Sequence, residues 1–405
     1  MQTQITPSFR DTPEGREADA ILRSCVHCGF CTATCPTYQL LGDELDGPRG
    51  RIYLIKQMFE GQPVTGKTRL HLDRCLTCRS CETTCPSGVR YGRLLDLGRE
   101  RVEAAAPRAP LSRLQRFLLR KVFPYPALVA PLLRLARMVA PALPSGLRKQ
   151  VPKEQSVLEW PADTRPRRML VLEGCVQSVA TPRTNAAAAR VLDGIGIQLI
   201  VSKDAGCCGA VSHHLSATDE ALAFFRRNID AWWPHVEQGV EAIVITASGC
   251  GTVVNDYGAL LEHDPDYREK AKRISELSRD IGEVLSDEGV VDQITFSTGR
   301  RVAFHSPCTL QHGQQLNGIV ESILKRAGFT LTDVPDDHLC CGSAGTYSIL
   351  QPKLSGKLRE NKLQALQSDR PELIATANIG CQMHLAGTSD VPVKHWIELL
   401  DEAMA

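Results

Sequence analysis

The chain has 405 residues, of which 43% are hydrophobic and 23% charged, and its formal net charge is +1. This length predicts two or three globular domains, and the near-neutral charge gives no overall signal for nucleic-acid binding. A chain of this size can bury several hydrophobic cores and does not need disulfides for stability. Its 16 cysteines therefore call for another role. No secretory signal opens the polar N-terminus, so we expect a cytoplasmic protein whose thiols serve metal or redox chemistry rather than disulfides.

Two cysteine runs with the same spacing lie near the start of the chain. Each has the form Cys-x-x-Cys-x-x-Cys-x-x-x-Cys-Pro, beginning at Cys25 and at Cys75. This is the pattern of a ferredoxin with two [4Fe–4S] clusters, in which three close thiolates hold one cluster and the fourth cysteine reaches the other. We therefore predict two sets of ligands. Cluster 1 is bound by Cys25, Cys28, Cys31 and Cys85, and cluster 2 is bound by Cys75, Cys78, Cys81 and Cys35.

Helical segments accompany these runs. Apolar residues recur at helical spacing in residues 49–60, with Pro48 before them and Gly61 after them, and residues 91–106 have a similar pattern. The long stretch between the two runs favours a helical variant of the ferredoxin module over a compact β-rich one. We predict a mostly helical domain over residues 1–103.

A basic, proline-rich segment follows, and we assign residues 104–165 to it as a connector. Residues 104–153 contain ten Lys or Arg residues and no Asp or Glu. Leu111, Leu114, Leu118 and Val122 fall along one face of a predicted helix. Such basic amphipathic elements dock on membranes or on partners, but a connector packed against the protein's own domains fits equally well. No run approaches the ~18–20 apolar residues of a membrane-spanning helix.

From about Met169, strand-like apolar runs alternate with helical segments, which indicates an α/β fold. The spacing of the cysteines repeats along this half. Cys175 lies 32 residues before the first of a Cys-Cys-Gly pair, and Cys308 lies 32 residues before the first of a second pair. We predict a duplication with copies at residues 166–290 and 291–405. The whole chain is then α+β and multi-domain.

Each copy contributes four cysteines to a second candidate site. In each copy, two of the three cysteine elements follow a predicted strand, where open α/β sheets bind ligands. Repetition at fixed spacing favours metal, cluster or thiol chemistry over core packing, and we predict a further cluster or a thiol site at these residues: Cys175, Cys207, Cys208, Cys250, Cys308, Cys340, Cys341 and Cys381. Several histidines lie nearby, but we assign no catalytic residue.

The sequence has no Walker A motif and no dinucleotide-binding Gly-x-Gly-x-x-Gly. If the system moves a hydride, the organic cofactor is therefore expected on another subunit.

The two ferredoxin runs followed by two Cys-Cys-Gly repeats resemble a known family. It includes heterodisulfide reductase subunits, the iron–sulfur subunit of anaerobic glycerol-3-phosphate dehydrogenase, lactate-utilisation proteins and glycolate oxidase iron–sulfur subunits, and the last share segments such as CVHCGFCTATCPTY, HLCCGSAGTY and TANIGCQ. The resemblance implies a complex at the cytoplasmic face of the inner membrane. In it, an FAD-containing flavoprotein oxidises glycolate to glyoxylate, and also D-lactate. This chain would carry the electrons to a quinone or other acceptor, and a second flavin-domain-like subunit would complete the complex.

One departure from that family concerns the fifth cysteine of each repeat. The heterodisulfide reductase subunits end each repeat with Cys-x-x-Cys, whereas here Ala247 and Asn378 stand three residues before Cys250 and Cys381. Four thiolates still suffice for an ordinary cluster, so we predict at least one further iron–sulfur cluster in this half. The alternative is a thiol/disulfide-active reductase subunit. A structural or nucleic-acid-binding iron–sulfur protein is disfavoured, because a structural role needs one cluster and no aromatic–basic stacking surface is evident.

Overall fold

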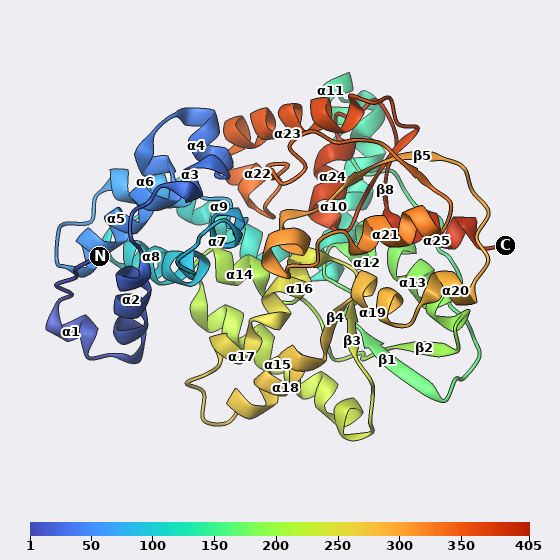
Figure 1. The fold of residues 1–405 in the computed structure, drawn as a ribbon, viewed down its shortest axis with the longest axis horizontal. Helices are drawn as coiled ribbons and strands as arrows, with labels where there is room; N and C mark the ends of the chain where they lie inside the picture. Colours follow the sequence, from blue (N-terminus) through green and yellow to red (C-terminus); the bar gives the residue numbers. More distant parts are fainter.

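The computed structural model describes residues 1–405, apart from the side chains of Ser145 and Leu147. The helical N-terminal part lies at one end of the molecule and two small parallel sheets lie at the other (Figure 1). This architecture confirms the predicted combination of a helical ferredoxin-like part and a duplicated α/β part.

The N-terminal part consists of short helices around the two cysteine runs. Helix α5 begins with Pro48 in its first turn, which confirms the predicted helix at residues 49–60. It packs against α8, and its buried Ile52, Ile55 and Phe59 share one hydrophobic cluster with residues of α2 and α8. The elements are α1 Pro7–Arg10, α2 Pro13–Ser24, α3 Phe30–Ala33, α4 Pro36–Leu41, η1 Glu44–Asp46, α5 Pro48–Phe59, α6 Gly66–Asp73, α7 Ser80–Thr83 and α8 Tyr91–Ala105.

The basic segment folds into α9 Pro110–Val122, α10 Pro126–Val139, η2 Ala140–Ala142 and α11 Ser145–Arg148. Its polar side is held by ion pairs: Arg108 and Arg116 contact Asp73, and Lys121 contacts Glu220. In the chain as described, no single helix is long and apolar enough to cross a membrane. Helix α9 and residues 126–142 reach that length and composition only together, with a bend of 107° between them.

The first copy of the duplicated half forms a four-stranded parallel sheet in the order β2-β1-β3-β4. Helices connect the strands, as parallel pairing requires. The elements are β1 Arg167–Val171, α12 Gln177–Ala180, α13 Arg183–Asp193, β2 Ile197–Val201, α14 Ala210–His214, α15 Thr218–Glu237, β3 Ile243–Ile245, α16 Ser248–Asn255, α17 Tyr257–Leu260, α18 Arg268–Leu277, β4 Ser278–Asp280, α19 Ile281–Asp287 and α20 Val290–Gln293.

The second copy repeats this topology with the order β6-β5-β7-β8. The equal strand order agrees with the duplication that the cysteine spacing predicts. The elements are β5 Arg301–His305, the π-helical turn η3 Thr309–Gly313, α21 Ile319–Arg326, β6 Thr330–Leu331, α22 Tyr347–Leu350, α23 Pro352–Gln367, β7 Leu373–Thr376, α24 Ile379–Ala386, β8 Val393–His395 and α25 Trp396–Ala403.

The two copies share one hydrophobic core. Val171 and Leu192 of the first copy belong to the same buried cluster as Phe304 and Trp396 of the second. Helix α25 packs against α13, and Asp401 accepts a hydrogen bond from Arg190 at 2.7 Å. The continuous core fixes the two sheets relative to each other, while the division into domains at residues 103, 165 and 290 stays a prediction.

Candidate metal centres

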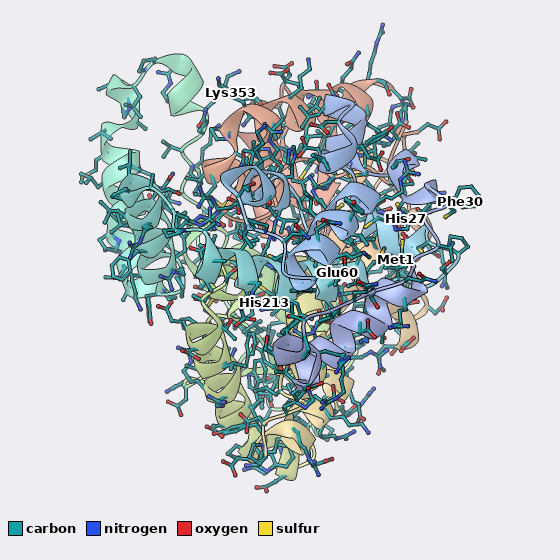
Figure 2. The ribbon with its side chains drawn as sticks, turned by 90° about the vertical axis from the view of Figure 1, so that its left-hand side faces the viewer. Met1, His27, Phe30, Glu60, His213 and Lys353 are labelled. Atoms are coloured by element: carbon teal, nitrogen blue, oxygen red, sulfur yellow. The ribbon has the colours of Figure 1, made fainter. Side chains whose placement is uncertain are left out.

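The predicted ligands of cluster 1 line one small cavity near the surface. Cys25, Cys28, Cys31 and Cys85 all contribute to its wall, and Cys81 also touches it. The backbone is left-handed at His27, with φ 57°, and at Gly29, with φ 88°, so the loop curls and its thiols face the same space. Cys28 is exposed, and His27 and Phe30 project at the edge of the molecule (Figure 2).

The predicted ligands of cluster 2 line a second small cavity and are more buried than those of cluster 1. Cys35 comes from the first run, and Cys75, Cys78 and Cys81 come from the second. Thr77 and Arg79 repeat the left-handed backbone of the first loop, with φ 54° and 58°. The structure thus brings together the two sets that exchange their fourth cysteine, while the ligand assignment itself remains a prediction.

Burial in both cavities disfavours free thiolates. It raises the pKa of Cys31 to about 11 and raises the pKa values of Cys78 and Cys81 well above the usual range. A metal ion bound to such thiols deprotonates them and removes this cost. The donor set therefore fits a cluster better than it fits free, reactive thiolates.

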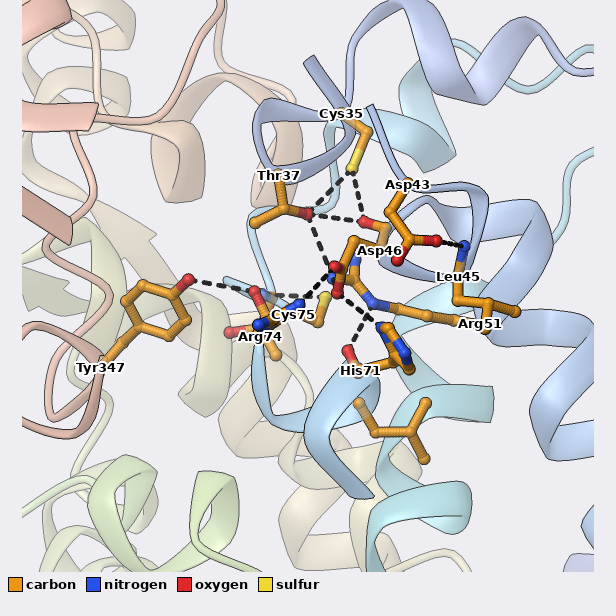
Figure 3. Close-up of polar contacts among 12 residues, drawn as sticks. Cys35, Thr37, Asp43, Leu45, Asp46, Arg51, His71, Arg74, Cys75 and Tyr347 are labelled. Carbon is orange, nitrogen blue, oxygen red and sulfur yellow. Dashed lines mark hydrogen bonds and ion pairs between the residues drawn. The ribbon is translucent and has the colours of Figure 1, made fainter. Parts of the chain in front are cut away.

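A buried polar network supports the second cavity (Figure 3). Asp46 is fully buried and lies 3.6 Å from the Arg51 guanidinium, which is itself buried. Its carboxylate also contacts His71 Nδ1 at 3.0 Å and Arg74 at 2.7 Å. The Arg74 carbonyl accepts a hydrogen bond from the Tyr347 hydroxyl at 3.1 Å, so the network also joins the N-terminal part to the second copy.

The sequence analysis missed both Asp46 and Arg51. Arg51 could have been found, because it falls on the apolar face of the predicted helix, next to Ile52 and one turn before Ile55. A charged residue at such a position needs a buried partner.

In the duplicated half, every cysteine element follows the carboxyl end of a parallel strand. Cys175, the Cys207–Cys208 pair and Cys250 follow β1, β2 and β3, and the second copy repeats this with β5, β6 and β7. Sequence analysis found a strand before two of the three elements in each copy. The two strands that were missed are β2 in the first copy, which has five residues, and β6 in the second, whose two residues are too few for a recognisable pattern.

The four cysteines of each copy meet at this edge of its sheet. Cys308 Sγ lies 3.8 Å from Cys340 Sγ, and Cys341 is adjacent to Cys381. The first copy has the same arrangement, in which Cys207 Sγ accepts the Gly209 N–H at 3.4 Å. Gly209 has φ 83°, and a Cβ there would lie 2.5 Å from the Phe225 ring, so this turn needs glycine.

Both sets of four cysteines adjoin one central cavity of about 480 Å³ between the two copies and the N-terminal part. All four cysteines of the first copy line it, together with Cys308, Cys340 and Cys381 of the second. On the side of the N-terminal part, Leu76 and Cys78 pack against Cys340 and Cys308. The candidate cluster 2 site is therefore next to the second-copy cysteines.

The histidines near the cysteines have different surroundings. His213 Nε2 lies 3.2 Å from Asp96 of α8, and although burial opposes it, this carboxylate raises the pKa of His213. Burial lowers the pKa of His214 and of His305 to about 3. His384 contacts Ser355 Oγ at 3.2 Å, His312 bonds Thr83 and the His338 carbonyl, and His338 is at the surface. Sequence reasoning could not pair His213 with Asp96.

Comparisons with known proteins agree with this organisation. Residues 21–89 match the family described as "4Fe-4S dicluster domain", and residues 169–255 and 302–386 match the family described as "Cysteine-rich domain". The chain is 56% identical over its whole length to the glycolate oxidase iron-sulfur subunit of Escherichia coli, covering 99% of that protein. The chain belongs to the family of glycolate oxidase iron–sulfur subunits. A probable glycolate oxidase iron-sulfur subunit of Bacillus subtilis is 28% identical over 94% of this chain and 91% of its own length.

A more distant relative matches just over half of this chain. Lactate utilization protein A of Bacillus subtilis is 22% identical over 56% of this chain and 96% of its own length. These matches confirm the two-cluster ferredoxin prediction and the duplicated cysteine-rich part, and they place iron–sulfur clusters in this chain.

Proposed function

We propose that this chain is the electron-transfer subunit of a complex that oxidises glycolate to glyoxylate, and also accepts D-lactate. A flavoprotein subunit with FAD performs the substrate chemistry, a second flavin-domain-like subunit accompanies it, and a quinone or other acceptor receives the electrons. The names of the relatives support the substrates. The missing dinucleotide motif supports a flavin on another chain.

One observation carries this proposal: the candidate cysteine sites follow one another from the surface to the central cavity. The outer site has the exposed Cys28. The next site has more buried cysteines, and Cys81 lines both cavities. Cys78 of this second site packs against the second-copy cysteines. Clusters bound at such sites transfer single electrons. The protein's part is to hold these sites in series and to keep water from the inner ones.

The exposed loop of the first run is a suitable docking place for the flavoprotein. Val26 and Phe30 are 66% and 61% exposed, although both are large apolar residues beside Cys28. Exposed apolar residues around a redox site support partner binding there, because contact at this loop shortens the path for the electron.

The central cavity is a suitable place for the acceptor. Its volume of about 480 Å³ accommodates a quinone head group, and its wall includes both thiol-rich edges. His213, held by Asp96, also lines it and can supply a hydrogen bond or a proton to a reduced acceptor.

The test uses the intact complex, purified anaerobically. With Cys78→Ala, glycolate should still reduce the flavin, but quinone reduction should fall at least ~100-fold, because loss of a cluster ligand interrupts the path. Ser24→Ala, next to Cys25 but outside the cysteine sets, is the matched control. Quinone reduction that survives Cys78→Ala would defeat the proposal. Turnover of a disulfide substrate by the chain alone would favour the thiol-reductase alternative instead.

We also propose that α9 and α10 contact the cytoplasmic face of the inner membrane peripherally. Their outward side carries large apolar residues, with Leu111 at 78% and Met138 at 72% exposure, and Leu128, Leu132 and Leu135 are also exposed. These helices are the teal ribbons at the left edge of Figure 2. Arg113 of α9 and Arg134 of α10 are exposed, and residues 104–153 contain no acidic residue, which suits anionic lipid.

Sedimentation with vesicles tests this contact. The complex should bind vesicles containing anionic lipid, and a Leu111→Asp, Leu132→Asp double variant should bind at least ~10-fold more weakly, because each change places a charge on the apolar surface. Val157→Asp, an exposed apolar residue outside these helices, is the control. Equal vesicle binding by both variants would argue against this surface.

A further inference from the structure

The two copies of the duplicated half differ at one buried pair of positions. At the end of β5, His305 pairs in register with Thr376 of β7. The corresponding positions of the first copy, 133 and 131 residues earlier, are Leu172 and Ile245. Leu172 and Ile245 are apolar and buried within the first-copy core. The second copy has therefore replaced two core residues by a histidine and its hydroxyl partner.

His305 occupies a position that core packing does not explain. It is 2% exposed, and Thr376 is fully buried. His305 Nδ1 lies 2.9 Å from Thr376 Oγ1, which leaves Nε2 available to another partner. One ring nitrogen of His305 and the Sγ atoms of Cys341 and Cys381 all lie within 4.8 Å of one another. Burying an imidazole is costly unless both nitrogens are used, so its other nitrogen is expected to have a partner among these thiols.

We propose that His305 is an iron ligand of the second-copy site, in addition to the four cysteines of that copy. This inference rests on the proposed cluster in the cysteine-rich half. Ligating histidines almost always hydrogen-bond through their second ring nitrogen, which fixes the tautomer and ring orientation, and Thr376 has that role here. Asn378 occupies the place of a fifth cysteine and instead donates a hydrogen bond to Cys381 Sγ at 3.3 Å.

The proposal makes the two sites chemically unequal. The first-copy site offers four thiolates, one for each iron of an ordinary four-iron cluster. The second-copy site offers four thiolates and a neutral imidazole, so one iron of its cluster would carry two protein ligands. Exchanging thiolate for imidazole ligands raises the reduction potential of an iron–sulfur cluster, because less negative charge surrounds the iron. His305→Cys, which adds a thiolate at the same place, should therefore lower the potential of the second-copy cluster.

Pulsed EPR on the full chain, purified anaerobically and reduced, tests the ligand directly. With ¹⁵N-histidine labelling, the wild-type protein should show a strong, isotope-sensitive nitrogen coupling of a bound imidazole. His305→Leu, which introduces the residue of the first copy, should lose this coupling. His384→Leu should keep it, because His384 lines the central cavity near the second-copy cysteines but, among the residues that the structure describes, belongs to no group of metal-competent side chains.

Iron analysis separates two claims: that the second copy binds a cluster, and that His305 is a ligand of that cluster. Loss of about four irons in Cys340→Ala, together with the His305-dependent coupling, supports both claims. If Cys340→Ala loses iron but the wild-type protein shows no strongly coupled histidine nitrogen, the cluster stands and His305 is not its ligand. If Cys340→Ala keeps all its iron, the second-copy cluster itself is wrong. A His305→Cys variant that retains its iron with an unchanged potential would also overturn the ligand role.

Discussion

Replacing Asp46 by Asn should destabilise the N-terminal part by about 3–5 kcal/mol, the range found when one partner of a buried ion pair is removed. Asp46 and Arg51 are 0% and 1% exposed, and the same carboxylate contacts His71 and Arg74 at 3.0 and 2.7 Å. Asn keeps the shape of the side chain but removes the carboxylate charge that pairs with the Arg51 and Arg74 guanidinium groups. The loss should also loosen the cluster 2 site, because Arg51 lines that cavity.

The assay is denaturant unfolding of the anaerobic protein, followed by the visible absorption of the clusters and by far-UV circular dichroism. Asp43→Asn is the matched control, since Asp43 is exposed and its cap on the Leu45 N–H can be made equally by Asn. The double variant Asp46→Asn, Arg51→Met should recover part of the loss, because it removes the unpaired charge. An Asp46→Asn protein that unfolds at the wild-type denaturant concentration would refute the structural role of this network.

Two further predictions concern stability elsewhere. Burial raises the pKa of Asp280 to about 7, so stability should fall by up to about 4 kcal/mol as the pH rises from 4 to 7. Asp280→Asn keeps the cap on the Gly282 N–H and should remove this slope, and an unchanged slope in the unfolding midpoints would disprove it. Gly98→Ala should cost about 1–3 kcal/mol of unfolding free energy, because its Cβ would lie 2.7 Å from Ile55. Gly66→Ala has open space and should cost nothing measurable, so equal effects would contradict this reasoning.

The features that the sequence predicted well depend on the spacing of residues that lie close together in the chain. Cysteine runs of fixed spacing, an amphipathic helix that begins at Pro48, and apolar strands that end at a cysteine each leave a pattern within a few residues. The duplication strengthened the prediction of a cysteine site, because the two copies have nearly the same cysteine spacing. The same logic explains why β6, with only two residues, was missed.

The features that the sequence could not predict depend on contacts between distant segments. Asp96 and His213 lie 117 positions apart, and Tyr347 and Arg74 lie 273 apart, so no local pattern links them. The central cavity arises because the two copies share one core and turn their cysteine-bearing edges toward the N-terminal part. The special position of His305 became evident only from the strand register that places it beside Thr376 and from its closeness to Cys341 and Cys381.

The most direct test of the account is rapid anaerobic mixing of the intact complex with glycolate, without an acceptor, while flavin and cluster absorption are followed separately. The account predicts that cluster absorption falls at least as fast as the complex turns over, and that Cys28→Ala, which removes a ligand of the outer site, leaves flavin reduction intact but slows reduction of the inner sites at least ~100-fold. Clusters that stay oxidised while the flavin is reduced, in a complex that turns over once an acceptor is added, would contradict it.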